Sequence, residues 1–246
     1  MKNKVLTSLL ALAMGFTALP ATTVLASETQ GVAINEDNFP DEYFRAGVKK
    51  YDENDDDVLS VDEAAQVTKL YLGWPEEGEE ISSVKGIEYF PELTYINLSA
   101  NKVETLDLSK NTKLESVVVY NSGMKSINLD GCNRILALDL DKNALTSLDL
   151  SSLTNLESLS CSYNEISTLD LSNNAKLEDI EAIYNNLHEL NIENLTNLQY
   201  IYVCQNYITS LDTSKNPNIE EVQYLAKETN LGTTEAVSFD AIPGFN

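Results

Sequence analysis

The sequence predicts a repeat solenoid that is mainly β, with two short strands in each 21-residue turn and a small helical cap at its N-terminal end. Three observations support this prediction. Residues 93–218 divide into six lines of 21 residues without an insertion or deletion, each line repeats the same apolar positions, and an acidic helix-like segment precedes the lines. A fixed period in this range indicates units that bury their apolar faces only against their neighbours.

Each line carries two apolar triplets. With the first residue of a line as position 1, the apolar positions of the first line are Leu93, Ile96, Leu98, Val103, Leu106 and Leu108. Because side chains alternate along a strand, each L-x-L triplet predicts a short strand with two inward side chains. Position 9 is polar, and its amides should bond backbone groups that the corner leaves unpaired. This position holds Asn101, Ser122, Asn143, Asn164, Asn185 and Asn206.

The pattern L-x-x-L-x-L, followed by a polar corner and a second such half, resembles the leucine-rich repeat family. The 21-residue length and the doubled half are similar to the bacterial subclass called IRREKO repeats. Together with an exported leader and an acidic head, the chain resembles secreted or surface leucine-rich repeat proteins of Gram-positive bacteria. The resemblance implies an exported binding protein that acts in adhesion or recognition.

Residues 1–26 predict a secretory signal peptide. A basic start at Lys2 and Lys4 precedes an apolar run that ends at Ala26, where we expect cleavage. An uncleaved membrane anchor is the alternative, although Pro20 interrupts the run. There is no second long apolar stretch, so we expect a soluble, exported monomer without membrane insertion. We expect release from the cell, or non-covalent retention at its surface.

The formal net charge of −23 restricts the classes of partner that the chain can bind. Such an acidic surface repels nucleic acid and anionic lipid, and favours cations or basic partners. Cys132, Cys161 and Cys204 fall at different repeat positions and indicate no disulfide framework. Cys161 takes an inward position and is expected to behave as a small apolar residue. The only histidine, His188, is expected at the surface.

Residues 27–69 predict a helical cap. Helices are expected over Asp41–Lys50 and Val61–Thr68. The loop between them resembles that of an EF-hand, with oxygen ligands at the spacing that directs about seven oxygens at one hard cation. The resemblance implies one calcium ion held by Asp52, Asn54, Asp56, the carbonyl of Val58, Ser60 and Glu63.

The loop departs from the EF-hand pattern in two ways. Asp57 stands where the family has glycine for a positive φ, a region that aspartate tolerates better than most residues. The loop is also single, whereas EF-hands usually occur in pairs. The alternative is an acidic cap that binds no metal.

Two segments flank the repeats. Residues 70–92 predict a degenerate first turn that starts at Leu70 and Leu72. Residues 219–246 predict a C-terminal cap, in which Ala241, Ile242 and Phe245 cover the last apolar layer. Atypical ends are expected because a solenoid must cover its terminal core.

The resemblance implies that ligands bind the face of the first strand in each repeat, where positions 3, 5 and 7 point outward. Tyrosines, serines and acids occupy these positions, and Tyr163, Tyr184 and Tyr207 lie at the neighbouring corner. Tyrosine offers rigid apolar area with a polar tip, which suits a basic protein segment or a sugar. Ordinary strand-surface chemistry is the alternative. The candidate ligand-binding residues are Tyr120, Asp139, Asp141, Asp179, Glu181, Tyr200 and Tyr202.

The sequence therefore predicts a non-catalytic protein that binds a protein or glycan at this face. One alternative is a structural or assembly module whose calcium-dependent head resembles a dockerin. A remote alternative is a glycoside hydrolase that uses Asp139 and Glu181, which stand two turns apart, at about 9–10 Å. That distance approaches the upper limit for an inverting pair. We expect the open face neither to exclude water nor to raise a carboxyl pKa.

Overall fold

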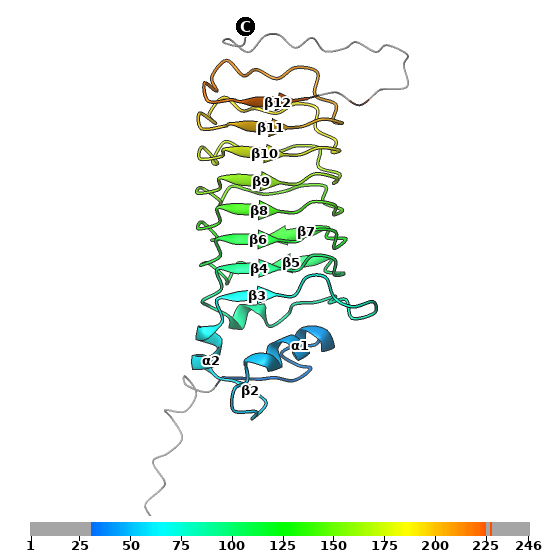
Figure 1. The fold of residues 1–246 in the computed structure, drawn as a ribbon, viewed down its shortest axis with the longest axis vertical. Coiled ribbons are helices and arrows are strands. Elements are labelled where there is room, and N and C mark those ends of the chain that lie inside the picture. Colours follow the sequence, from blue (N-terminus) through cyan, green and yellow to red (C-terminus); the bar gives the residue numbers. More distant parts are fainter. Residues whose placement is uncertain (1–30, 225–226, 228–246) are drawn as a thin grey trace, which may run out of the picture. The chain divides into compact units, whose positions relative to one another are not determined.

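The computed structural model describes residues 31–224 and Lys227. The predicted signal peptide, residues 1–26, and the predicted capping residues Ala241, Ile242 and Phe245 lie outside the described residues. The predicted fold class is confirmed: a parallel β-solenoid follows a small helical segment (Figure 1). Within the described ranges, no helix is long and apolar enough to cross a membrane.

The main sheet has eight parallel strands, one from each turn, in the order β12-β11-β10-β9-β8-β6-β4-β3. Pairing keeps the same repeat position opposite itself, as in Ile96, Val117 and Leu138 at position 4. The residues at this position are buried from Leu70 of β3 to Ile201 of β11, and Val222 of β12 is partly buried, so one ladder of leucine, isoleucine and valine forms the core under the sheet. The strands are β3 Lys69–Tyr71, β4 Tyr95–Asn97, β6 Ser116–Val118, β8 Ala137–Asp139, β9 Ser158–Ser160, β10 Asp179–Glu181, β11 Tyr200–Tyr202 and β12 Glu221–Gln223.

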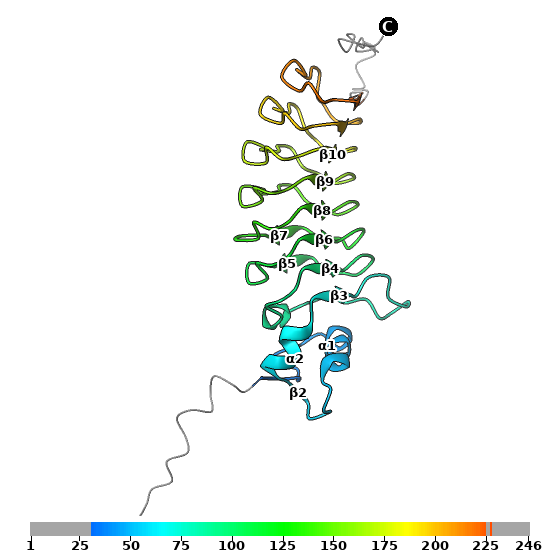
Figure 2. The same cartoon turned by 60° about the vertical axis from the view of Figure 1, so that its left-hand side comes forward.

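The second half of each repeat differs from the prediction. Among the described residues, it forms a strand only in the first two repeats, as β5 (Thr105–Asp107) and β7 (Ser126–Asn128), which pair with each other (Figure 2). In the later repeats Leu148, Leu169 and Leu190 are still buried at the same position. A leucine can be buried by side-chain contacts alone. The apolar pattern therefore predicts that each turn of the coil closes, but it does not require the backbones of the second halves to pair as strands.

The polar column at position 9 is confirmed as a hydrogen-bonded ladder. The side-chain nitrogen of Asn164 donates to the carbonyls of Leu140 and Cys161, both at 3.0 Å, and its oxygen accepts from the Leu145 N–H at 3.0 Å. Ser122 makes the equivalent bond to Leu98 through its hydroxyl, at 2.9 Å. Each of these side chains therefore joins its own corner to the preceding turn.

The head contains β1 (Val32–Ala33), α1 (Glu42–Val48), the 3-10 turn η1 (Lys49–Tyr51), β2 (Val58–Leu59) and α2 (Val61–Gln66). β1 pairs with β2 in antiparallel fashion. The second helix ends two residues before the predicted Thr68, because Val67 is extended and the Thr68 carbonyl already accepts the N–H groups of Thr94 and Tyr95. The chain thus enters the main sheet sooner than helical periodicity suggests.

An aromatic cluster joins the head to the first turn. Phe39 lies 5.7 Å from Tyr89, which belongs to the 3-10 turn η2 (Ile87–Tyr89). Gly86 begins this turn with φ 104°, and a Cβ there would meet the Phe39 ring at 2.3 Å, so glycine is required for both reasons. The Asp41 carboxylate caps α1 and also accepts from the N–H groups of Ser82 and Ser83. The head therefore packs on the degenerate first turn through both apolar and polar contacts.

Candidate ligand-binding face

The parallel register places the predicted acids in three neighbouring columns on the outer face of the main sheet, at positions 3, 5 and 7. Asp139 of β8 lies opposite Ser160 of β9, which lies opposite Glu181 of β10. Asp179 occupies the adjoining column, at position 3. With one strand between them, Asp139 and Glu181 are separated by about 9–10 Å. Asp141 lies two residues beyond the end of β8. Four of the seven predicted ligand-binding residues are therefore grouped around β9.

The carboxyl pKa values of Asp139, Asp179 and Glu181 are raised, chiefly by burial. Burial raises the pKa of Asp139 and of Asp179, and the Glu181 pKa is raised first by burial and then by the charges of Asp141 and Asp139. The expectation that nothing on this face raises a carboxyl pKa is therefore wrong. The serines and neighbouring strands shield part of each carboxylate from water. This contribution to the pKa cannot be predicted from the repeat pattern of the sequence.

Asp141 has a different environment from the other three acids. Its carboxylate accepts from the Ser160 hydroxyl and the Ser162 N–H, both at 2.6 Å. Its own N–H donates to Asp139 at 3.1 Å. These bonds hold Asp141 in place and leave the other three acids as the outward charges of the acidic group.

The three predicted tyrosines lie in two separate places on the stack. Tyr200 and Tyr202 are on β11, and their hydroxyls donate to Glu220 at 2.7 Å and Glu221 at 2.9 Å in the last turn. Tyr120 lies beyond β6 on the other side of the acidic group, where its ring is 5.9 Å from Trp74. The acidic group is therefore flanked by aromatic side chains on both sides along the stack.

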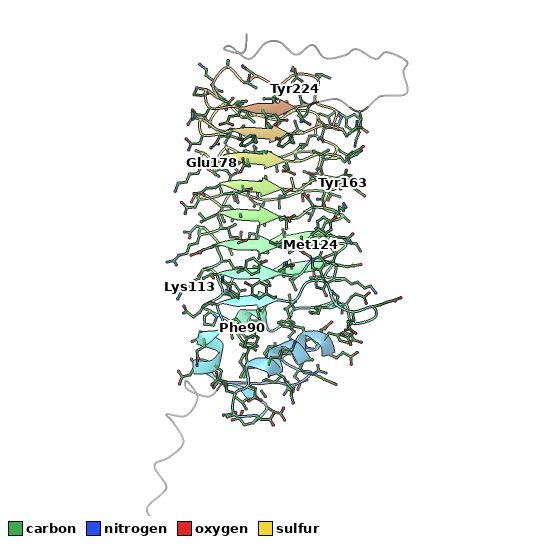
Figure 3. All side chains as sticks on the ribbon, in the orientation of Figure 1. Phe90, Lys113, Met124, Tyr163, Glu178 and Tyr224 are labelled. Carbon is green, nitrogen blue, oxygen red and sulfur yellow. The ribbon has the colours of Figure 1, made fainter. Side chains whose placement is uncertain are left out.

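Exposed side chains continue along the corner that follows the strands, and we call Trp74, Tyr120, Lys142, Tyr163 and Tyr184 the corner ridge. The Tyr163 and Tyr184 rings stack with centroids 4.7 Å apart and planes at 19°. Figure 3 shows Tyr163 at the end of the sheet toward which the strands point, with Glu178 at the opposite end. Trp74, Tyr163 and Tyr184 are 67%, 48% and 44% exposed.

Trp74 and Tyr71 were not among the predicted site residues. They belong to the degenerate first turn, whose alignment with the repeats is unclear from periodicity. Pairing of Leu70 with Ile96 places Tyr71 at position 5 and Trp74 at position 8. An alignment of Leu70 with position 4 of the repeats would have identified Tyr71 and Trp74 from the sequence.

Two serines at position 7 do not face outward as predicted. Ser99 and Ser162 are 1% and 2% exposed. Their hydroxyl oxygens accept the N–H groups of Tyr120 at 3.3 Å and Ile183 at 3.1 Å in the following turn. A small polar side chain can enter the gap between turns there, where a larger residue must point outward.

The thiols lie mostly inside the solenoid. Cys161 is fully buried, as expected, and burial raises its pKa to about 12. Cys132 is also buried, and its sulfur lies 3.2 Å from the Leu108 carbonyl. Within the described residues Cys132, Cys161 and Cys204 are all free. His188 is exposed, as expected, and its ring stacks on Tyr207 at 5.0 Å.

The acidic loop of the head has part of the expected geometry. Asp57 has φ 60°, so it takes the backbone conformation for which an EF-hand uses glycine. Its carboxylate pairs with Lys49 at 2.5 Å. The loop strand Val58–Leu59 pairs with Val32–Ala33, a strand from outside the loop, instead of with a second loop.

The loop carboxylates bind the backbone of the loop itself. Asp52 accepts the N–H groups of Asp56 and Asp57, and Asp56 accepts that of Val58. Glu63 accepts from Ser60 and from the Glu53 N–H, as part of the capping box of α2. In the described part of the chain, no three acidic, histidine or cysteine side chains are grouped as metal ligands. The oxygen donors suit a hard cation, but they must turn toward a common centre to hold one.

The fold and this face define a leucine-rich repeat solenoid with an acidic, tyrosine-bearing sheet surface. No protein-family model matches the sequence, and the curated proteins include no match. Among solved structures the chain is similar to internalin C2 of Listeria monocytogenes, with a TM-score of 0.57 and 20% identity over 79% of this chain and 97% of that one. This likeness shows the fold.

Two further Listeria monocytogenes structures are similar at lower scores. One is the functional domain of InlJ, which includes a cysteine ladder, with a TM-score of 0.43 and 24% identity over 78% of this chain. This chain spans about half of that one, 52% of its length. The other is the internalin InlF, with a TM-score of 0.37 and 19% identity over 83% of this chain and 80% of that one.

Proposed function

We propose that the protein is a non-catalytic binding protein, secreted or held at the cell surface, that recognises a protein or glycan through the outer face of its main sheet. The observation that carries the proposal is the composition of this face. Its tyrosines and acids stand at fixed register on a rigid ladder and are partly exposed, while the leucines and asparagines beneath them form the core. Pre-positioned aromatic and charged groups are the residues that dominate binding energy at interfaces.

The remaining support is of two kinds. The fold is shared with internalin C2, and the N-terminal residues 1–26 predict export. The glycoside hydrolase alternative keeps one feature in its favour, because the Glu181 pKa is raised as in a general acid. The open sheet surface around it favours binding over hydrolysis, since hydrolysis needs a site that excludes water.

Combined alanine substitution of Tyr120, Tyr200 and Tyr202 is expected to weaken ligand binding at least tenfold, because each aromatic contact at an interface contributes on the order of 1 kcal/mol or more. A glycan array and a pull-down supply the ligand, and titration of the captured ligand measures the change. Val61→Ala is the control, since Val61 is 52% exposed on α2 and lies away from the sheet. Undiminished capture by the triple variant would show that recognition lies elsewhere.

We also propose that the Asp52–Glu63 loop binds one calcium ion. The positive φ of Asp57 and the antiparallel pairing of Val58–Leu59 support it. Asp52, Asn54, Asp56, Ser60 and Glu63 would supply side-chain oxygens, and Val58 its carbonyl. The ion would fix the turn between α1 and α2 and so stiffen the head that packs on the first turn of the solenoid. The same site would serve the assembly role that a dockerin-like head implies.

Calcium at about 100 times its dissociation constant is expected to stabilise the protein by about 2.7 kcal/mol. Melting curves in calcium and in chelator measure this difference. Glu63→Gln separates the two roles of the side chain, because glutamine keeps the capping box but loses the carboxylate that grips the ion. The variant should show no calcium shift, and it should melt slightly below the unsubstituted protein in chelator, because the glutamine NH2 cannot accept the Glu53 N–H that Glu63 binds. Identical curves for the unsubstituted protein in both conditions would end the calcium proposal.

A further inference from the structure

The corner ridge already binds cations of its own chain. The Lys142 ammonium lies 4.9 Å from the Tyr120 ring centroid and 5.8 Å from that of Tyr163, and it donates a hydrogen bond to the Tyr120 hydroxyl, at the edge of that ring. One turn beyond the ridge, the Lys227 ammonium lies 5.0 Å from the Tyr207 ring. A cation at this distance over an aromatic face is attracted by the ring quadrupole. The tyrosines of the ridge can therefore attract a cation through their hydroxyls and rings, and Lys142 occupies only the part of the ridge beside Tyr120 and Tyr163.

The backbone of the ridge indicates that its aromatic residues are not there for stability. Trp74, Tyr163 and Tyr184 have φ of 59°, 57° and 55°, a left-handed conformation that is unfavourable for bulky side chains. Other repeats place alanine, asparagine, lysine or glutamine at the same position with the same conformation. Trp74 is largely exposed and about half of each tyrosine is exposed, so apolar burial offsets only part of this strain. Strain retained at an exposed position points to function.

The neighbouring sheet surface supplies uncompensated negative charge. Positions 3, 5 and 7 of the six repeats contain no lysine or arginine. The five ion pairs found within the described residues all lie elsewhere, and none involves Asp139, Asp179 or Glu181. A surface with acids in its centre and cation-binding rings along one edge complements a positively charged partner.

We infer that the corner ridge and the carboxylates beside it form the docking surface for an extended protein segment rich in lysine or arginine. This inference rests on the proposed function and names the class of its ligand. Cationic side chains of the segment lie against the exposed rings of Trp74 and Tyr184, as Lys142 lies at the hydroxyl edge of Tyr120, and others reach Asp139, Asp179 and Glu181. From the turn of Trp74 to that of Tyr184 the ridge spans five steps, about 24 Å, which about seven extended residues cover.

The ring geometry favours a basic segment over a glycan. Sugar rings stack on exposed aromatic faces, whereas Tyr163 and Tyr184 each turn one face onto the other ring. The Tyr120 ring is already in contact with Lys142. Charge and hydrogen bonding, which a lysine or arginine segment provides and a neutral sugar does not, therefore match what the surface offers.

The test uses a fluorescent peptide of alternating arginine and serine, about ten residues long, and measures its anisotropy with the purified protein at about 0.15 M salt. We expect the variant Trp74→Ala/Tyr163→Asn/Tyr184→Asn, which leaves the net charge unchanged, to weaken binding at least tenfold. Asparagine tolerates the left-handed backbone, so the melting temperature of this variant should stay equal or rise by about 2–4 °C. The acidic variant Asp139→Asn/Asp179→Asn/Glu181→Gln should also lose at least tenfold.

A charge-matched control guards against non-specific attraction to an acidic protein. Asp130→Asn/Glu189→Gln/Glu193→Gln removes the same number of charges from exposed positions outside the sheet face and should change binding less than about threefold. Equal losses in both acidic variants would overturn the inference, as would unchanged binding by the ridge variant. Capture of a neutral glycan that the ridge variant abolishes would also overturn it, yet leave the proposed function standing. The proposed function itself fails only if the tyrosine triple variant retains its captured ligand.

Discussion

Replacement of Phe44 by alanine is expected to lower the free energy of unfolding by about 3–5 kcal/mol and to unfold the head and the solenoid in one transition. Phe44 of α1 is fully buried, and its ring lies 6.0 Å from Phe39, which in turn packs on the first turn of the solenoid. Loss of this ring leaves a cavity in the layer that covers the end of the solenoid core. Chemical denaturation followed by circular dichroism and tyrosine fluorescence measures both the loss and the number of transitions.

Lys50→Ala supplies the matched control for Phe44, because Lys50 is exposed on η1 in the same head and should change stability by less than about 0.5 kcal/mol. Two separate transitions, with the solenoid melting unchanged, would contradict the prediction. That result would favour an independent head of the kind that the assembly alternative requires. A single shifted transition would instead identify the head as part of the solenoid core.

Replacement of Asn185 by alanine is expected to lower the free energy of unfolding by about 3 kcal/mol. The buried amide donates to the carbonyls of Cys161 at 2.9 Å and Ala182 at 3.3 Å, and accepts the Ile166 N–H at 3.0 Å. Both carbonyls keep a second partner in the ladder, but the buried N–H group does not. An orphaned buried donor costs about 1–3 kcal/mol, and the lost bonds and small cavity add to it. Denaturant titration measures the total loss in the free energy of unfolding.

Asn194→Ala provides the comparison for the ladder, since Asn194 is exposed in the same repeat and should be within about 0.5 kcal/mol of neutral. Asn185→Ser should fall between the two, because serine already serves this column at Ser122. A loss at Asn185 no greater than that at Asn194 would show that water satisfies the corner in place of the amide. It would then remove the argument that this column holds the turns together.

The apolar half of the fold could be predicted because it depends on a local period. Position 4 of each repeat is buried and pairs with position 4 of the next, as Leu138 pairs with Leu159. The same alternation predicted that Asp139 and Glu181 share a column. The second strand could be predicted only in part, because β5 and β7 pair while the later turns bury their leucines without backbone pairing.

The corner ridge could be predicted only in part. Tyr163 and Tyr184 are visible as tyrosines at one repeat position, but their stacking and their left-handed backbone depend on how successive corners are placed. Trp74 joins them only because Leu70 enters the main sheet beside Ile96. The raised pKa of Glu181 likewise arises from burial and from charges on another turn, at positions far apart in the chain.

The amino-acid sequence alone was sufficient for the solenoid, its 21-residue turn, the buried asparagine column and the strand face on which Asp139, Glu181 and Tyr202 stand. These features follow from local alternation and a fixed period, and both are written along the chain. The three-dimensional structure was needed for the acidic group around β9, the corner ridge from Trp74 to Tyr184, and the turn at Asp57, where loop carboxylates bind backbone N–H groups. Each of these depends on distances between turns, or on competition between partners, which exist only once the turns are stacked.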